Sequence, residues 1–171
     1  VPLIQDVLKK IGVQIVVKEG VEADDVLATV ATEAEAEGME VLLASGDRDS
    51  FQLVTDNTTV IYPGRSPSDL KLMDPAAVEE RYGVTPERYP HLAALVGETA
   101  DNLPGVPGVG DKTAAQWLKK YDGLEGVIEH ADDIGGKRGQ ALRDHLDDVR
   151  RNRKLNELLR DVELDVTIDE L

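Results

Sequence analysis

The chain has 171 residues, of which 41% are hydrophobic and 31% charged, and its formal net charge is −15 at pH 7. This length suits one compact unit, and no apolar run approaches the roughly 18 residues that span a membrane, so we expect no membrane partner and a cytoplasmic location. The absence of cysteine excludes disulfides and cysteine zinc sites. The negative net charge of the chain opposes the binding of polyanions on average. Lysines and arginines are unevenly placed along the sequence, however, so a local basic face is still allowed.

Helices and strands alternate in the first part of the chain. Apolar spacing, helix-forming residues and closing glycines predict a helix over 3–11, a buried strand over 13–17, a helix over 23–37 and a strand over 41–44. This alternation predicts an α/β fold with a mostly parallel sheet, flanking helices and right-handed crossovers.

The second part is predicted to be helical. After Thr59-Val60-Ile61 the pattern changes, and Asp74-Pro75 and Thr85-Pro86 each have the pattern of an N-cap followed by proline in the first helical turn. Further helices are expected over 111–121, 124–129 and 137–159, before an extended tail over 162–166. We therefore expect an α/β part over 1–83 and a helical part over 84–171.

Acidic residues follow both predicted strands of the first part. EADD follows the first strand, with Glu22 expected in the loop before the helix, and GDRD follows the second. Carboxyl ends of parallel strands share one edge of a sheet, where ligands collect. Each cluster alone has a simpler explanation, namely a helix N-terminus or a turn cap. With two more acids farther on, the candidate metal-binding and catalytic residues are Glu22, Asp24, Asp25, Asp47, Asp49, Glu98 and Asp101.

So many carboxylates in one place predict a bound cation. Like charges about 4 Å apart repel by roughly 1–4 kcal/mol, and hard cations prefer carboxylate oxygens, so Mg²⁺ or Mn²⁺ fits best, with enough ligands for two ions. A calcium-binding EF-hand is excluded because, counting from Asp47, Gln52 stands where glycine is required. The Asp-x-Asp of some sugar-nucleotide transferases also matches residues 47–49, on a very short pattern.

The glycine-rich stretch GVPGVGDKT, residues 105–113, predicts a phosphate-backbone clamp. It has one residue too many for the P-loop pattern and no strand before it. A hairpin opening a helix instead resembles the helix-hairpin-helix element, which holds DNA backbone through glycines and helix N–H groups. The alternative is a helix corner without a ligand. The candidate DNA-binding residues are Gly105, Val106, Gly108, Val109, Gly110, Lys112, Thr113, Lys119 and Lys120, with Arg138, Arg143, Arg150, Arg151 and Arg153 less strongly indicated.

The segments EADD, ASGDRDSFQLV and GETADNLPGVPGVGDKTA, in this order, resemble the 5′-nuclease domain of bacterial DNA polymerase I, in the flap endonuclease superfamily. The resemblance runs from Val1 to about Val166. It implies a PIN-like α/β nuclease core, a helix-hairpin-helix subdomain that also binds K⁺, and polymerase domains in the same full-length chain. It also implies a two-metal hydrolase that cuts DNA, or an RNA primer on DNA, near a 5′ flap or end in replication and repair at the bacterial nucleoid.

The sequence also departs from that family. Glu98 stands where the family more often has aspartate, and the family's first metal-binding strand and its threading arch do not precede Val1. We therefore expect a fragment of a longer chain, with weak or absent nuclease activity by itself. Two other functions remain open, a non-catalytic structure-dependent DNA-binding module and an acidic protein-interaction domain. Salt-dependent affinity would distinguish these two.

Overall fold

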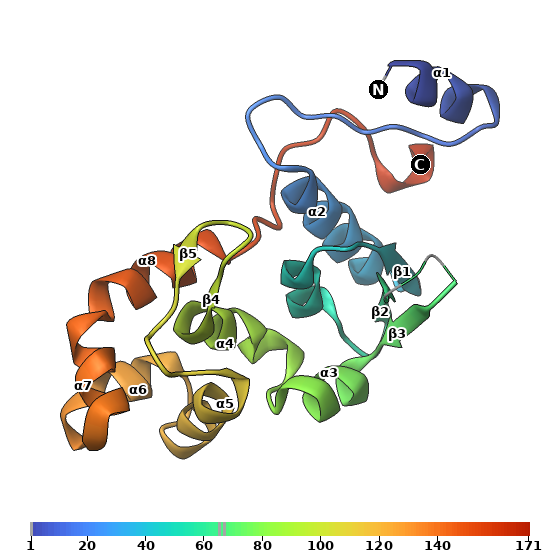
Figure 1. Ribbon diagram of the computed structural model, residues 1–171. Coiled ribbons are helices and arrows are strands. Elements are labelled where there is room, and N and C mark those ends of the chain that lie inside the picture. Colours follow the sequence, from blue (N-terminus) through green and yellow to red (C-terminus); the bar gives the residue numbers. More distant parts are fainter. Residues whose placement is uncertain (1, 65, 67) are drawn as a thin grey trace.

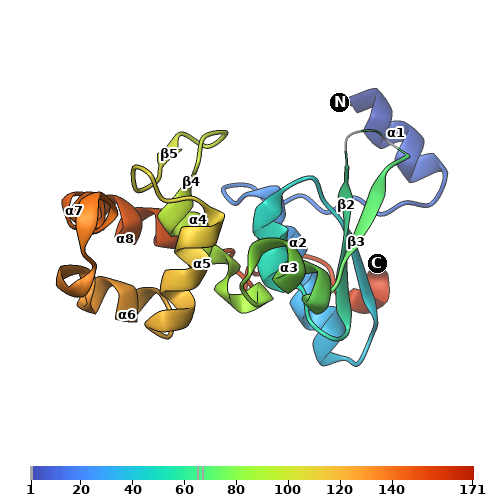
Figure 2. The same cartoon turned by 60° about the horizontal axis from the view of Figure 1, so that its bottom comes forward.

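The computed structural model describes residues 2–64, 66 and 68–171. Its helical part lies beside a smaller part built on a three-stranded sheet (Figures 1 and 2). The α-helices are α1 (Pro2–Lys10), α2 (Ala23–Ala36), α3 (Pro75–Tyr82), α4 (Tyr89–Val96), α5 (Asp111–Lys120), α6 (Leu124–Glu129), α7 (Gly136–Asp144) and α8 (Leu146–Leu155). The strands are β1 (Val41–Ala44), β2 (Thr58–Pro63), β3 (Leu70–Met73), β4 (Gly97–Glu98) and β5 (Leu103–Pro104), and the 3₁₀ helices are η1 (Arg48–Leu53), η2 (Pro86–Arg88), η3 (Ala131–Asp133) and η4 (Ile168–Glu170).

The larger sheet has the order β1-β2-β3. Strand β1 pairs parallel with β2, which places Leu43 beside Val60, while β2 pairs antiparallel with β3. Leu43, Val60 and Met73 are buried, and α2 packs against β1. The parallel pair fixes the edge where β1 ends, and this edge carries the residues that follow Ala44.

Several sequence predictions are confirmed. The predicted helices over 3–11, 23–37 and 124–129 correspond to α1, α2 and α6, and the predicted strand over 41–44 is β1. Helix α3 begins as expected, because the Asp74 carboxylate accepts a hydrogen bond from the Ala77 N–H at 2.8 Å and Pro75 stands in the first turn. It ends at Gly83, whose left-handed φ of 74° suits glycine.

The predicted strand over 13–17 is wrong. These residues form no strand, and Val13 and Val17 are 45% and 72% exposed. A strand needs a neighbour for its N–H and C=O groups, and within the described residues none pairs with this segment. It runs instead beside the C-terminal tail, where Lys18 and Asp165 lie 3.6 Å apart (Figure 1).

The predicted helix over 137–159 is also wrong as one element. It breaks at His145 into α7 and α8, and residues 156–159 leave the helix to cross the α/β part. Strand β3 was not predicted. The tail over 162–166 contains no strand, although the Val162 N–H is held by the Thr29 hydroxyl at 3.2 Å.

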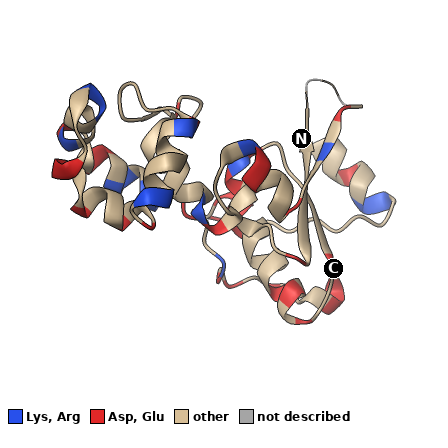
Figure 3. Cartoon of the chain, turned by 90° about the horizontal axis from the view of Figure 1, so that it is seen from below, with Lys and Arg blue, Asp and Glu red and all other residues tan. Residues whose placement is uncertain are grey.

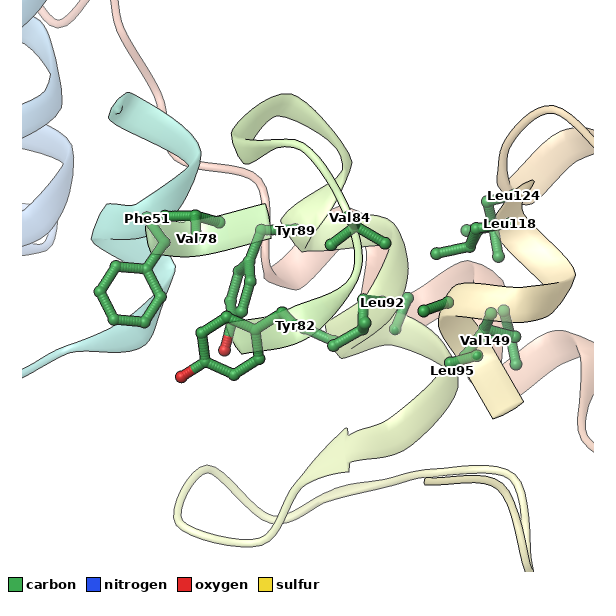
Figure 4. Packing of buried hydrophobic residues seen from close by; sticks show 14 of the residues in the cluster. Phe51, Val78, Tyr82, Val84, Tyr89, Leu92, Leu95, Leu118, Leu124 and Val149 are labelled. Atoms are coloured by element: carbon green, nitrogen blue, oxygen red, sulfur yellow. The ribbon is translucent and has the colours of Figure 1, made fainter. Parts of the chain in front are cut away.

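One buried cluster runs through both parts (Figure 4). Phe51, Tyr82 and Tyr89 pack edge to face or tilted, with ring centroids 5.1 to 5.6 Å apart. Leu92 and Leu95 of α4 extend this cluster to the helical part, where the buried residues include Leu118, Leu124 and Val149. Helix α4 therefore joins the two parts, and the hairpin that follows it is held at a fixed position beside the sheet edge.

Candidate metal-binding and nucleic-acid-binding site

An open cleft of about 660 Å³ brings together the acidic residues that lie far apart in sequence. Its walls are the start of α2, the turn after β1, the β4–β5 hairpin and the segment after α8. All seven predicted carboxylates line it, namely Glu22, Asp24, Asp25, Asp47, Asp49, Glu98 and Asp101. The predicted convergence of these acids is therefore present, although only the acids of the GDRD segment follow a strand of the larger sheet.

The three acids of the EADD segment reach the cleft from the beginning of α2. Glu22 is the N-cap residue, with extended φ and ψ of −77° and 155°, and its side chain makes no capping hydrogen bond. Asp24 and Asp25 lie in the first turn. The Asp25 Oδ1 accepts a hydrogen bond from the Leu159 N–H at 2.8 Å. Glu22 thus lies in the loop as predicted, and Asp25 has an additional role in holding the C-terminal segment.

The turn after β1 orients the GDRD pair. The Asp47 Oδ1 accepts a hydrogen bond from the Asp49 N–H at 2.9 Å, and the Asp47 carbonyl accepts one from the Ser50 hydroxyl at 2.6 Å. These bonds start η1 and turn Asp49 inward, where its Oδ1 is buried and has no hydrogen-bond partner in the described part of the chain. Asp47 therefore caps η1 and also lines the acidic cleft.

The β4–β5 hairpin carries Glu98 and Asp101. A Cβ at Gly105 would overlap the Val96 carbonyl, so glycine permits the close approach of the hairpin to α4. The buried Asn152 of α8 donates from Nδ2 to the Pro104 carbonyl at 2.8 Å. These contacts fix the position of both acidic side chains relative to the sheet.

The electrostatics of the cleft favour a bound cation. Burial, and then the charges of Glu98, Asp47, Asp101 and Asp24, raise the pKa of Asp49 to about 8. Burial also raises the pKa of Asp24 and of Glu98, with further contributions from neighbouring carboxylates. A positive ion among these groups would remove the repulsion that raises these values.

The donor set fits a hard divalent ion, because it consists of carboxylate oxygens and includes the unpaired Asp49 Oδ1. Across the described ranges 2–64, 66 and 68–171, no three histidine or acidic side chains already lie close enough to hold an ion together. The carboxylates must therefore rotate toward the ion when it binds. Exposed Glu22, Asp47 and Asp101 have the solvent-side freedom to do so.

Sequence reasoning missed the wall that residues 154–159 form. Gln52 holds this segment: its amide nitrogen donates to the Asn156 carbonyl at 2.8 Å, and its amide oxygen accepts from the Leu158 N–H at 3.2 Å. Lys154 also lines the cleft and is the one basic residue among its described lining. The partners are 104 and 106 residues apart, so no local sequence signal could have indicated them.

The predicted DNA clamp forms a compact hairpin before α5. The Val106 N–H donates to the Leu95 carbonyl at 2.9 Å, Gly108 has a φ of 76°, and Gly110 is the N-cap of α5. Val106 and Val109 are buried, so their side chains pack the hairpin and only their backbone can face a ligand. The candidate lysines Lys112, Lys119 and Lys120 are exposed near the two ends of α5, and Thr113 is half-buried in its first turn. Basic and acidic residues are both spread over the helical part of the chain (Figure 3).

The arginines of α7 and α8 mostly have protein partners. Arg150 and Arg151 pair with aspartates three residues earlier, and Arg153 pairs with Glu157 four residues later. Arg143 donates to the carbonyls of Ala131 and Ile134. These contacts are typical of a solvated, self-paired face and make these side chains weaker candidates for DNA contacts than the α5 lysines.

Together these features define a class of protein: an α/β domain with a carboxylate cluster beside the end of β1, joined to a helical subdomain with a helix-hairpin-helix element. Two family descriptions match the chain, "5'-3' exonuclease, N-terminal resolvase-like domain" over residues 1–83 and "5'-3' exonuclease, C-terminal SAM fold" over residues 84–171. The chain therefore belongs to the 5′-3′ exonuclease family.

Named relatives agree with this family. The chain is 50% identical over its whole length to DNA polymerase I of Mycobacterium leprae, and 37% identical over 99% of its length to DNA polymerase I of Bacillus subtilis. It spans 19% of the length of each of these relatives. Among solved structures, T5 5′-exonuclease with bound zinc has a TM-score of 0.80 at 24% identity, covering 92% of this chain and 58% of that one. The Rad2 catalytic core has a TM-score of 0.55 at 18% identity, covering 92% of this chain and 52% of that one.

No helix in the described part of the chain is both long and apolar enough to cross a membrane. The solved neighbours support the fold, which is an α/β nuclease-type core followed by a helical subdomain.

Proposed function

We propose that this chain is a metal-dependent 5′-nuclease unit, which hydrolyses phosphodiester bonds of DNA, or of an RNA primer on DNA, near a 5′ flap or 5′ end. The observation that carries this proposal is the cleft lined by the seven predicted carboxylates, which come from three separate segments. The proposal extends to a place beside polymerase domains in a full-length chain and to work in replication and repair at the bacterial nucleoid. Both extensions are supported by relatives that are bacterial DNA polymerase I.

The proposed division of the chain is a metal-binding α/β part over 1–83 and a helical DNA-binding part over 84–171. The two family descriptions change at the same residue, which supports this division. Glu98 and Asp101 come from the second part but line the cleft of the first. The metal site is therefore completed by the hairpin of the helical part.

Two Mg²⁺ or Mn²⁺ ions are the proposed cofactors, held by Asp47, Asp49, Glu98, Asp101 and the acids at the start of α2. When bound, such ions supply an activated water for attack and neutralise charge on the phosphate. The carboxylates of this chain would orient the ions, and Asp49 has a buried oxygen for which residues 2–64, 66 and 68–171 provide no hydrogen-bond partner. The structurally similar T5 5′-exonuclease was solved with divalent zinc ions, which supports a divalent ion here. The proposed K⁺ at the hairpin rests on the family resemblance alone.

The glycine-rich hairpin over 105–110 and helix α5 are proposed to hold the DNA duplex. Backbone N–H groups at the N-terminus of α5 favour an anion, and Lys112 lies exposed in the first turn. Lys119 and Lys120 end the same helix and can reach a second phosphate. Contacts of this kind position a duplex without reading its sequence, as a nuclease that recognises structure requires.

The test is cleavage of a labelled 5′-flap duplex with Mn²⁺ or Mg²⁺ and with a chelator. It uses this chain alone and this chain joined to the preceding segment of the Mycobacterium leprae relative. We expect metal-dependent cleavage by the joined chain, with a loss of 100-fold or more in Asp47→Asn and no change in Asp56→Asn, which lies at the opposite end of β2. Salt-sensitive binding without cleavage by either chain would replace the nuclease with a non-catalytic DNA-binding module.

A further inference from the structure

Arg48 lies in sequence between Asp47 and Asp49, two acids of the metal-binding cleft, but forms an ion pair with neither. Its Nε donates to the Tyr62 hydroxyl at 3.5 Å, and the side chain is exposed. The ion pairs of the described residues involve other basic side chains, so no carboxylate lies within 4 Å of the Arg48 guanidinium. With 34 acidic and 19 basic residues in the chain, an arginine left without an acid partner is available to an external anion.

A second cleft, of about 440 Å³, lies beside the metal-binding cleft, and Arg48 lines it. Tyr82 and Tyr89 form its inner wall, and the β4 end of the hairpin and the start of α5 form its rim. Asp47, Glu98 and Asp101 line both clefts, so the two spaces meet at the proposed metal ligands. Asp111 is the remaining acid of the second cleft.

The Tyr82 hydroxyl is a second unused donor in this cleft. Tyr82 is 6% exposed, and its hydroxyl is buried with no hydrogen-bond partner among the described residues. Leaving a buried hydroxyl unpaired costs about 1–3 kcal/mol, so an incoming acceptor would be favoured. Figure 4 shows the Tyr82 ring at one end of the buried cluster, with its hydroxyl directed away from Leu92.

Arg81 adds positive charge next to Tyr62 and Tyr82. Its guanidinium carbon lies 5.3 Å from the Tyr82 ring centroid and 5.7 Å from that of Tyr62. Arg81 likewise has no ion pair with any described residue. Arg48 and Arg81 thus both contact Tyr62, and Arg81 also lies over the Tyr82 ring.

We propose that this second cleft binds a phosphodiester group of the nucleic acid adjacent to the one being cut, with Arg48 and the Tyr82 hydroxyl as donors. The inference rests on the proposed function and adds a phosphate subsite to it. Divalent ions on Asp47, Glu98 and Asp101 would neutralise the acidic rim, so the subsite is complete only when the metal site is filled. The phosphate then lies between the metal ligands and Arg48.

The experiment is the affinity of the chain for a 5′-flap duplex over a range of salt concentrations, with Ca²⁺ and separately with a chelator. Arg48→Gln removes the charge, Arg48→Lys keeps it, and Tyr82→Phe removes only the hydroxyl. Lys10→Gln in the distant α1 is the matched control for charge loss (Figure 1). Thermal unfolding of each variant shows that it is folded.

With Ca²⁺, we expect Arg48→Gln to weaken binding about 5- to 20-fold at low salt. It should also reduce the slope of log affinity against log salt by about 0.9 if the phosphate is in duplex, or about 0.7 if it is in single strand. Tyr82→Phe should weaken binding about 3-fold with the slope unchanged. Arg48→Lys should keep the slope, and Lys10→Gln should match the unchanged chain. With a chelator, the effect of Arg48→Gln should shrink.

An unchanged slope in Arg48→Gln, with normal binding by the parent chain, would overturn the subsite and leave the proposed function intact. Equal losses in Arg48→Gln and Lys10→Gln would also overturn it, since the effect would then come from net charge alone. If the parent chain shows no salt-sensitive binding, the proposed function fails and the subsite fails with it. Lys112→Ala removes only the proposed phosphate contact at the start of α5. It should weaken binding whether or not the subsite exists, so it tests the proposed DNA-binding element independently of Arg48.

Discussion

Replacing Asp49 by asparagine should stabilise the chain in the absence of metal. Its carboxyl has a pKa of about 8 in the folded protein against an ordinary value of 3.8, chiefly because it is buried. The unfolded chain therefore loses this proton at a lower pH than the folded chain, and stability falls as pH rises from about 4 to about 8. Asparagine keeps the shape and stays neutral, so this loss disappears.

The size of the stability gain follows from the two pKa values of Asp49, about 8 in the folded protein and 3.8 ordinarily. One pKa unit corresponds to about 1.4 kcal/mol, so the difference sets an upper bound of about 5.7 kcal/mol above pH 8 and about 1.6 kcal/mol at pH 5. Solvent access and sharing of charge among the neighbouring carboxylates reduce these bounds, and we expect a gain of about 1–3 kcal/mol at pH 8 and under about 1 kcal/mol at pH 5.

The assay is urea unfolding in a chelator, followed by circular dichroism and by the fluorescence of Trp117, the single tryptophan. Asp56→Asn, an exposed carboxylate at the far end of the sheet, should change stability by less than about 0.5 kcal/mol. Mn²⁺ should raise the stability of the parent chain more than that of Asp49→Asn. A gain that does not grow between pH 5 and pH 8, or a loss at both, would refute the reasoning.

Three further predictions concern the contacts that assemble the site. Gln52→Ala should cost about 2–3 kcal/mol in urea unfolding, because it leaves two buried backbone groups of the tail unpaired, whereas exposed Gln116→Ala should be near neutral. Gly105→Ala should cost at least about 2 kcal/mol, because its Cβ would overlap a backbone carbonyl, whereas Gly46→Ala meets its nearest atom at an ordinary 3.6 Å. Asn152→Leu should cost about 1–2 kcal/mol and speed hydrogen exchange in the β4–β5 hairpin, because two carbonyls lose a donor.

Each of these has a clear contrary result. Equal effects of Gln52→Ala and Gln116→Ala would mean that the tail is not held by the buried amide. A neutral Gly105→Ala would mean that the hairpin can move away from α4 at little cost. Unchanged exchange in the hairpin of Asn152→Leu would show that α8 does not position Glu98 and Asp101.

The sequence alone determined the elements whose signals are local. Asp74 and Pro75 specify the start of α3, and the apolar run over 41–44 specifies β1. The acids that follow β1 could be assigned to a sheet edge because parallel strands share their carboxyl ends. Short-range capping and strand geometry act within a single turn or strand, so they can be read without the fold.

The tertiary structure decided everything that depends on distant partners. The residues over 13–17 have the composition of a strand, but pairing needs a neighbour, which the described chain does not provide. Gln52 meets Asn156 and Leu158 across more than 100 residues, and this contact builds one wall of the acidic cleft. Packing between these segments decides which carboxylate is buried and unpaired. It also decides which arginine has no acidic partner. Local sequence specifies the elements of the site, whereas long-range packing specifies their charge environment.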